Sequence, residues 1–345
     1  MLAIDRRAAR ATWTVFLVAL LLATLFLIRK TLLIFTVALL FAYLLSPMVD
    51  LVNRHVNRDR SRTVSLALVY LFLLAVLVTV GIALGTEIVQ QATALAARLP
   101  QLVRNLEQPV ELPIPAWAAQ AIREQVEQHV VDILPFLQRA GREILELMSN
   151  LPFLVLVPVI SFFLLKDGSE FRRLLLAHYI EPGPRRAVLE EILSDLHRML
   201  AQFMRAIVIL CFATFAFYGA FFAAIGMPYG ILLATLAGFL EFIPVVGPLT
   251  ASAAIVLVAI FTGFPHWPWI IVFLVAYRLL QDLILQPYLM SSGIALHPVL
   301  VIFGVMAGEQ IAGIPGMFLS IPVLAALRVL AIRLVKLKSP AATSA

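Results

Sequence analysis

Acidic side chains stand inside the most apolar stretches of this chain. Glu241 comes three residues before Pro244, at the end of one apolar run, and Glu309 comes four residues before Gly313, at the end of another. A carboxylate near a helix C-terminus faces the unfavourable pole of the helix dipole, so a proton, a cation or a basic partner would stabilise it. Charged groups inside membrane spans usually line a pathway or pair with each other. These positions therefore predict proton or cation binding.

More polar residues lie in an apolar run between these two carboxylates. Arg278 and Asp282 are four residues apart, so they share one face of a helix. One alternative is a structural ion pair of Arg278 with Asp282 or with Glu241. The other is a carboxylate that binds a proton and a cation in turn. The candidate coupling residues are Glu241, Arg278, Gln281, Asp282, Glu309 and Gln310.

Other chemistry has little support in the sequence. The single cysteine, Cys211, cannot form an internal disulfide, and it lies in an apolar run where a small buried side chain is the expected role. No Ser/His/Asp order, Gly-rich phosphate loop or HExxH motif is present. We therefore expect no enzyme activity, no resident metal and no cofactor.

The composition places the chain in lipid. Of its 345 residues, 62% are hydrophobic and 13% are charged, about half the charged fraction of a soluble domain. The mean hydropathy is +0.99. A net charge of +6 could suggest nucleic acid, but the basic residues lie at segment ends and in short loops, where they act as topology determinants. The prediction is an all-α polytopic membrane protein without a nucleic-acid partner.

The apolar runs predict about eight helical segments. A crossing needs about 20 apolar residues, and the candidate spans are 11–28, 31–49, 63–85, 151–165, 204–226 and 269–288. The basic N-terminus before 11–28 resembles the start of a signal peptide. The next run follows almost at once without a cleavage site, so an uncleaved anchor is expected.

Two further apolar regions, 229–263 and 298–335, are interrupted by proline and glycine. Each arm of the first has about 15 residues, so it is about 22 Å long and too short to cross a hydrocarbon core of about 30 Å. Both regions are predicted to be broken, re-entrant helical hairpins; ordinary tight hairpins packed in a bundle are the alternative. The residues expected to shape the breaks are Pro244, Gly247, Pro248, Pro298, Gly313, Pro315 and Gly316.

The distribution of charge predicts the topology. Basic residues put the N-terminus, the loop 53–62 and the C-terminal tail in the cytoplasm, and leave only Arg29 and Lys30 on the opposite side, in a short hairpin between the first two spans. The two broken hairpins would then enter from opposite faces and point at each other. Paired broken helices of this kind indicate a transporter's midplane site.

Three regions follow from this topology. Residues 1–86 would form three transmembrane helices. Residues 87–150, with eight acids and five Arg, would form an amphipathic extracytoplasmic helical insert that either caps the bundle or mediates self-association. Residues 151–345 would form the transport region, with a cytoplasmic helix at 166–205.

The C-terminal half resembles the autoinducer-2 exporter family of bacterial membrane proteins. The matching motifs are Glu241-Phe-Ile-Pro-Val-Val-Gly-Pro248, Gln286-Pro-Tyr-Leu-Met, Leu296-His-Pro298 and Gly313-Ile-Pro-Gly-Met-Phe-Leu-Ser-Ile-Pro322. Their order and spacing also match, and the layout of the whole chain is similar to that of the family. One departure concerns ion selectivity: where the family has an Asp-Asn pair, this chain has Gln281-Asp282.

The resemblance implies a secondary transporter in the bacterial inner membrane, assembled as a homo-oligomer, with a pentamer as the suggested form. It implies movement of a small polar solute or a cation, coupled to a proton or sodium gradient. Some members are linked to autoinducer-2 export and others to sodium/proton antiport, so the family name does not give the substrate. The alternatives are a sodium(lithium)/proton antiporter within the family and a non-transporting membrane scaffold. Flux measured in liposomes separates transport from scaffolding.

Overall fold

The computed structural model describes residues 6–55, 62–104, 151–179, 184–289 and 296–338. All regular structure in these ranges is helical. In chain order the helices are α1 (Arg6–Leu27), α2 (Arg29–His55), α3 (Arg62–Arg104), α5 (Leu151–Tyr179), α6 (Pro184–Ile225), α7 (Gly230–Leu240), α8 (Val246–Phe261), α9 (Trp267–Leu280), the π-helix η2 (Gln281–Leu285), α10 (Gln286–Leu289) and α11 (Pro298–Lys338). The predicted insert beyond 104 and most of the loop 53–62 lie outside the described residues.

The predicted all-α membrane class is confirmed. Five of the described helical stretches are long and apolar enough to cross a membrane: 29–55, 63–95, 186–225, 267–289 and 298–333. Shorter apolar helices add 12–27, α7 and α8. The chain is therefore an all-α, multi-pass membrane protein.

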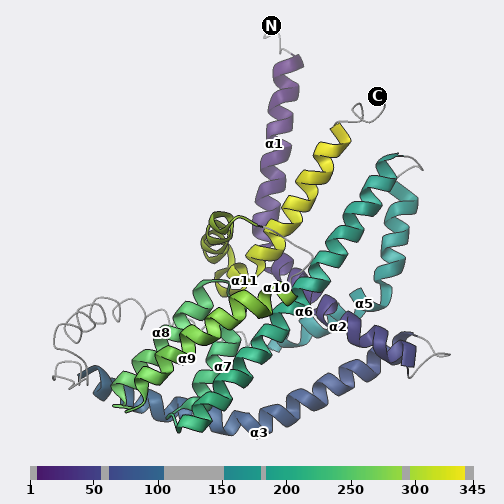
Figure 1. Cartoon of the computed structure of the whole chain (residues 1–345). Helices are drawn as coiled ribbons and strands as arrows, with labels where there is room; N and C mark the ends of the chain where they lie inside the picture. Colours follow the sequence, from purple (N-terminus) through teal and green to yellow (C-terminus); the bar gives the residue numbers. More distant parts are fainter. Residues whose placement is uncertain (1–5, 56–61, 105–150, 180–183, 290–295, 339–345) are drawn as a thin grey trace, which may run out of the picture.

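The predicted hairpin at Arg29 and Lys30 is wrong. The amide of Ile28 donates to the carbonyl of Thr24 at 3.0 Å, and the amide of Leu32 donates to the carbonyl of Ile28 at 2.9 Å. Helical hydrogen bonds thus pass through the junction, and the chain bends from α1 into α2 without reversing (Figure 1). Neither glycine nor proline interrupts this stretch, and two charged side chains alone do not end a helix.

Three helices extend further than expected. The predicted cytoplasmic helix 166–205 and the span 204–226 meet in α6, which is one helix of 42 residues, and α5 continues past residue 165. Likewise α3 passes the proposed boundary between 1–86 and 87–150 without a break. Backbone hydrogen bonds do not depend on side-chain polarity, so a change from polar to apolar residues leaves a helix intact where no breaker intervenes. The division into three regions remains a prediction.

The first predicted break is present. Helices α7 and α8 have 11 and 16 residues, or about 16 and 24 Å at 1.5 Å per residue, so neither covers the hydrocarbon core. They form a hairpin whose tip is residues 241–245 (Figure 1). Gly247 is required just after the tip, because a Cβ there would overlap the carbonyl oxygen of Leu240. Pro248 lies in the first turn of α8, where its missing N–H costs nothing.

The second break lies inside α11. Ala312 (φ −147°, ψ 20°) and Gly313 (φ 62°, ψ −143°) leave the helical conformation, and Pro315 lies just beyond them in the first turn of the second arm. The arms fold back closely, since a Cβ on Gly308 would overlap the backbone of Gly316. The second arm, 314–338, is about 37 Å long and can cross a bilayer alone. The two broken regions are therefore unequal.

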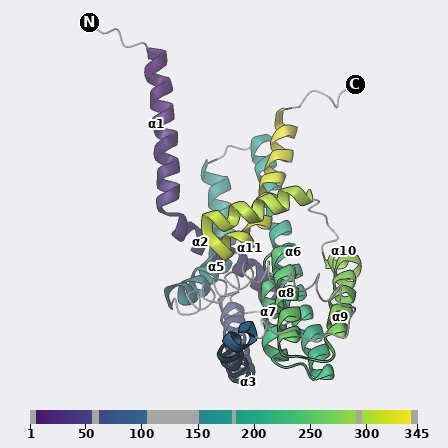
Figure 2. The same cartoon turned by 90° about the vertical axis from the view of Figure 1, so that its left-hand side faces the viewer.

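The arrangement brings the two breaks together. In Figure 1, α7 begins at the lower end of the molecule, whereas α11 ends at the upper end; Figure 2 shows the first arm of α11 lying across the bundle. Phe242, in the tip of the α7–α8 hairpin, contacts Phe318 on the second arm of α11 with ring centroids 5.4 Å apart. The largest apolar core, drawn mainly from α6, α7, α8 and α9, also includes Val305 and Met317 of α11.

Candidate functional site

A cavity of about 300 Å³ lies beside the tip of the α7–α8 hairpin. Helices α6, α7, α8 and α9 all contribute to its wall, together with the first residue of η2. The polar side chains in the wall are Thr214, Tyr218, Glu241, Ser252, Tyr277, Arg278 and Gln281. Three of the six predicted coupling residues therefore line one space.

Glu241 is the acidic group of this cavity. It follows the last residue of α7 and keeps helical angles (φ −57°, ψ −24°), and only 7% of the residue is exposed. Glu241 therefore lies at a helix C-terminus, as predicted, where the helix dipole disfavours a negative charge. An ionised carboxylate in this position must be stabilised by its immediate neighbours.

The hydrogen-bond donors to Glu241 are uncharged, although the wall of the same cavity also contains Arg278. The Nε2 of Gln281 donates to Oε1 of Glu241, and Oγ1 of Thr214 donates to Oε2 at 3.3 Å. The hydroxyls of Thr214 and Tyr277 are 2.8 Å apart. Thr214 has a single hydroxyl proton, so while it donates to Glu241 it must accept from Tyr277. A chain of hydroxyls is therefore directed at the carboxylate, and it can reverse when Glu241 itself carries a proton.

Arg278 has another partner. Its Nε lies 2.9 Å from Oδ2 of Asp282, and both side chains are 43% exposed. Gln286 also donates to Asp282, at 3.3 Å. This is the predicted pair at i and i+4. Among the described residues no basic side chain forms an ion pair with Glu241, so the alternative of a neutralised Glu241–Arg278 pair is not realised.

A π-helical turn lies where the polar residues change from buried to exposed. Helix α9 passes into η2 at Gln281, which is 1% exposed, while the next residue, Asp282, is exposed. π-turns inside α-helices often occur at functional sites. Sequence reasoning missed this turn. One available signal was Pro287, which has no N–H to donate and so disturbs the hydrogen bonds of the preceding turn.

The reversal at the hairpin tip is made by a valine. Val245 has φ 66° and ψ −57°, and the amide of Val246 donates to the carbonyl of Pro244 at 2.7 Å. This is the strained form of γ-turn, adopted by a β-branched residue that disfavours positive φ. The sequence analysis assigned the break to Pro244, Gly247 and Pro248 and did not single out Val245; Gly247 permits the close approach of the two helices. Strained residues tend to occur where a site requires them, and Val245 lines the cavity.

Glu309 and Gln310 lie elsewhere. Both are exposed on the first arm of α11, and neither lines the cavity beside Glu241. The structure therefore does not bring the second acidic position together with the first. Pro298, another predicted element, begins α11.

Four polar residues of the cavity wall were not predicted, and two of them, Thr214 and Tyr277, belong to the hydrogen-bond network of Glu241. Thr214 lies in the middle of α6 and is 2% exposed, and Tyr277 is 4% exposed. A threonine in an apolar helix gives no signal by itself, because its hydroxyl commonly bonds to its own helix. Tyr277 directly precedes Arg278 at the start of a polar run, which was the available clue.

Within the described ranges, no three His, Cys, Asp or Glu side chains are close enough together to hold a metal ion.

Comparison with known proteins gives a consistent family match. A model described as "AI-2E family transporter" matches residues 15–336. The chain is 26% identical over 312 residues to "Putative transport protein YueF" of Bacillus subtilis (strain 168), covering 86% of this chain and 82% of that protein. It is 25% identical over 299 residues to "Putative permease PerM" of Escherichia coli (strain K12), covering 83% and 82%.

Proposed function

Since this chain belongs to the AI-2E transporter family, we propose that it is a secondary transporter whose coupling group is the carboxylate of Glu241. The transported species is a small polar solute or a cation, and its movement is coupled to a proton or sodium gradient. The supporting observation is a carboxylate that is buried at a helix C-terminus, receives hydrogen bonds from neutral donors and forms no ion pair with a described residue.

The energetic argument starts from the cost of a buried charge. An ionised carboxylate without a counter-charge costs several kcal/mol even after relaxation. A proton or a cation on Glu241 removes that cost, so the empty site is the least stable state. Exchange of one bound ion for the other is then favoured over release without replacement, which is the condition for coupling two fluxes.

The hydroxyl chain supports both occupied states. With a cation bound, Thr214 and Tyr277 donate toward the carboxylate and stabilise its charge. With a proton bound, Glu241 donates to Thr214, which then donates to Tyr277. In each case Thr214 both donates and accepts one hydrogen bond, so its buried hydroxyl stays paired in both states.

Sodium(lithium)/proton antiport is the second candidate. The polar groups around the cavity are mainly oxygens, from the carboxylate, the hydroxyls of Thr214, Tyr218, Ser252 and Tyr277 and the amide of Gln281. Oxygen ligands suit hard cations. In this version the cation is itself the transported species.

We further propose that the protein lies in the bacterial cytoplasmic membrane with both termini in the cytoplasm. The start of α1, the end of α11 and the adjoining ends of α5 and α6 lie toward one end of the molecule (Figure 1), which supports that orientation. A homo-oligomer, in the pentameric form suggested by the family resemblance, is also proposed. That proposal rests on the family resemblance, because the exposed apolar residues 12–27 of α1 are also what a lipid-facing helix presents.

Purified protein in proteoliposomes tests the function. Proton release after addition of sodium, lithium or potassium is recorded with an internal pH dye, beside a parallel assay of autoinducer-2 export. We expect wild-type flux to be abolished in Glu241→Gln, which keeps the size of the side chain and removes its charge. Glu309→Gln is the matched control, because that carboxylate is exposed and outside the cavity.

Two results would overturn the proposal. The first is wild-type flux in a folded Glu241→Gln protein. The second is no gradient-driven flux with any of these ions or the signal molecule, which would favour a membrane scaffold.

A further inference from the structure

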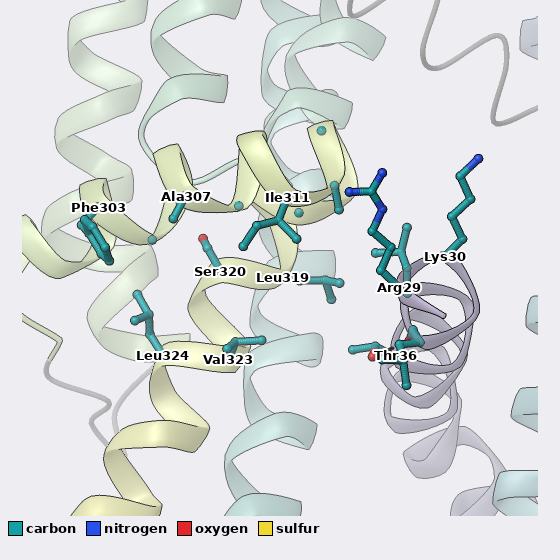
Figure 3. A pocket seen from close by; sticks show the side chains of 17 residues that line it. Arg29, Lys30, Thr36, Phe303, Ala307, Ile311, Leu319, Ser320, Val323 and Leu324 are labelled. Atoms are coloured by element: carbon teal, nitrogen blue, oxygen red, sulfur yellow. Dashed lines mark hydrogen bonds between the residues drawn. The ribbon is translucent and has the colours of Figure 1, made fainter. Parts of the chain in front are cut away.

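A second and larger cavity, of about 680 Å³, opens between the first turns of α2 and the two arms of α11 (Figure 3). We call it the α2–α11 groove. Ala307 and Ile311 contribute from the first arm of α11, Val323 from the second arm, and Leu33 from α2. The groove therefore touches both sides of the break at Gly313, and it shares no lining residue with the cavity at Glu241.

The wall of the groove offers almost only hydrocarbon. Two hydroxyls face this region, and both are already bonded to their own helices. Oγ1 of Thr36 donates to the carbonyl of Leu32 at 2.8 Å, and Oγ of Ser320 donates to the carbonyl of Met317 at 2.6 Å. A polar solute would lose its hydration here without gaining partners, so the groove suits an apolar chain.

Two cations stand at one end of this apolar space. Figure 3 shows Arg29 and Lys30 projecting from the start of α2, beside the end of the first arm of α11. Both are exposed, and no ion pair joins either one to an acidic residue in the part of the chain that the structure describes. The guanidinium of Arg29 lies over the ring of Phe26, 4.4 Å from its centroid, an arrangement that leaves its N–H groups open to an anion.

Arg29 and Lys30 lie at a height in the molecule that matches the boundary between lipid and water. Leu33, one turn after Arg29, belongs to a cluster with Phe203 and Met204 of α6. That cluster lies where the charged half of α6 ends, because Arg205 is its last charged residue. Arg29 therefore sits near the boundary between the polar and apolar parts of the molecule, with the groove beside it.

We propose that the α2–α11 groove binds an anionic phospholipid, with an acyl chain along the apolar wall and the phosphate at Arg29 and Lys30. A guanidinium binds phosphate oxygens through two parallel hydrogen bonds, and basic pockets between membrane helices select anionic headgroups. A zwitterionic lipid such as phosphatidylcholine also has a phosphate, but its choline cation offsets that charge and is repelled by Arg29 and Lys30, so an anionic headgroup binds more tightly. Because the chain would lie against both arms of α11, the bound lipid also holds the angle between them.

Native mass spectrometry of the full chain in neutral detergent tests the charge requirement. The protein is given equal amounts of phosphatidylglycerol and phosphatidylcholine. We expect wild type to retain phosphatidylglycerol at least about five-fold in excess, and the double variant Arg29→Gln/Lys30→Gln to show no preference. The matched control, Arg54→Gln/Arg205→Gln, removes two exposed cations outside the groove and should keep the wild-type ratio.

A second pair of variants tests the acyl chain without changing any charge. Ala307→Trp fills the groove and should reduce retention of phosphatidylglycerol to the level of phosphatidylcholine. Ile302→Trp adds the same bulk to an exposed position of the same arm that does not line the groove, and should retain lipid as wild type does. Size-exclusion profiles and helical circular dichroism confirm that each variant is folded.

Each remaining outcome would overturn the proposal. Equal retention of the two lipids by wild type, or unchanged selectivity in Arg29→Gln/Lys30→Gln, removes the headgroup site. Displacement of the lipid by millimolar inorganic phosphate shows a simple anion site without a chain. Disulfide-linked dimers through Ala307→Cys, in a Cys211→Ala background, show that a second copy of the chain occupies the groove.

Discussion

At the scale of single residues, the environment of Glu241 differs from that of the other acids with described partners. Asp195, Glu190, Glu191 and Asp282 each form an ion pair, and these pairs are partly exposed. Glu241 is buried and bonded to an amide and a hydroxyl. An exposed ion pair contributes about 0–1 kcal/mol, whereas a buried carboxylate without an ion-pair partner costs more free energy to ionise. The proposed role of a bound proton or cation at Glu241 rests on this difference.

The first prediction concerns the hydroxyl of Thr214. Thr214→Val keeps the shape of the side chain but removes the donor to Glu241 and the link to Tyr277. We expect proteoliposome flux to fall by about ten-fold or more, because loss of a hydrogen bond to a charged group costs about 1.5–3 kcal/mol. Thr214→Ser restores the hydroxyl and should recover most of the flux. Equal activity of the valine and serine variants would show that the hydroxyl has no role.

The second prediction concerns the Arg278–Asp282 pair. Because this pair is half-exposed and lies within one helix, Arg278→Gln should change the thermal unfolding midpoint very little. We expect its flux to stay within about two-fold of wild type, on the same argument of weak exposed pairs. A loss as complete as that of Glu241→Gln would instead make Arg278 part of the coupling machinery.

At the scale of the elements, the tip of the α7–α8 hairpin depends on one close approach. The predicted change is Gly247→Ala, whose Cβ would overlap the carbonyl oxygen of Leu240. Separating the two helices should destabilise the protein by about 3 kcal/mol or more, measured as the thermal unfolding midpoint in detergent. Gly81→Ala is the control: it has open space around its β position and should be neutral or gain up to about 1 kcal/mol of helix propensity.

The sequence analysis located the helix breaks that proline and glycine impose. It was wrong about the reversal between α1 and α2, where neither residue is present. Pro244, Gly247 and Pro248 locate the first hairpin because proline cannot continue a helix. The charges of Arg29 and Lys30 suggested a reversal that the continuous hydrogen bonds exclude. Charged side chains show which part of a segment prefers water. They do not show whether the helix ends there, because helix continuity depends on backbone geometry.

In the candidate site, too, one part could be predicted from sequence and another could not. Glu241 was predicted because its charge conflicts with an apolar helix end. Its donors come from residues that are 27 and 40 positions away in sequence, Thr214 and Gln281. Only the tertiary packing of α6 with α7, and of α9 with α8, brings them together. For the π-turn at Gln281, Pro287 was a local signal, but it does not show which side chains the turn directs toward Glu241.

At the scale of the whole molecule, ion pairs connect α6 with α11. Nε of Arg333 lies 3.0 Å from Oδ2 of Asp195, and Arg333 also contacts Glu191. We predict that Arg333→Gln loosens these helices, seen as a broader distance distribution between spin labels on α6 and α11. Arg186→Gln removes a pair that lies within α6 alone and should leave the distribution unchanged. Identical widths for the two variants would contradict a docking role for Arg333.

The length of α6 has a mechanical consequence. Asp195 and Thr214 lie on the same unbroken helix, about 28 Å apart along its axis. An unbroken helix moves largely as a rigid body, so a displacement of α6 at Asp195 also displaces Thr214. Helix α6 thus connects the Arg333 ion pairs with the cavity at Glu241. Any ligand or lipid that tilts the C-terminal end of α11 would therefore also move α6 through Arg333, and with it the hydroxyl of Thr214 beside Glu241.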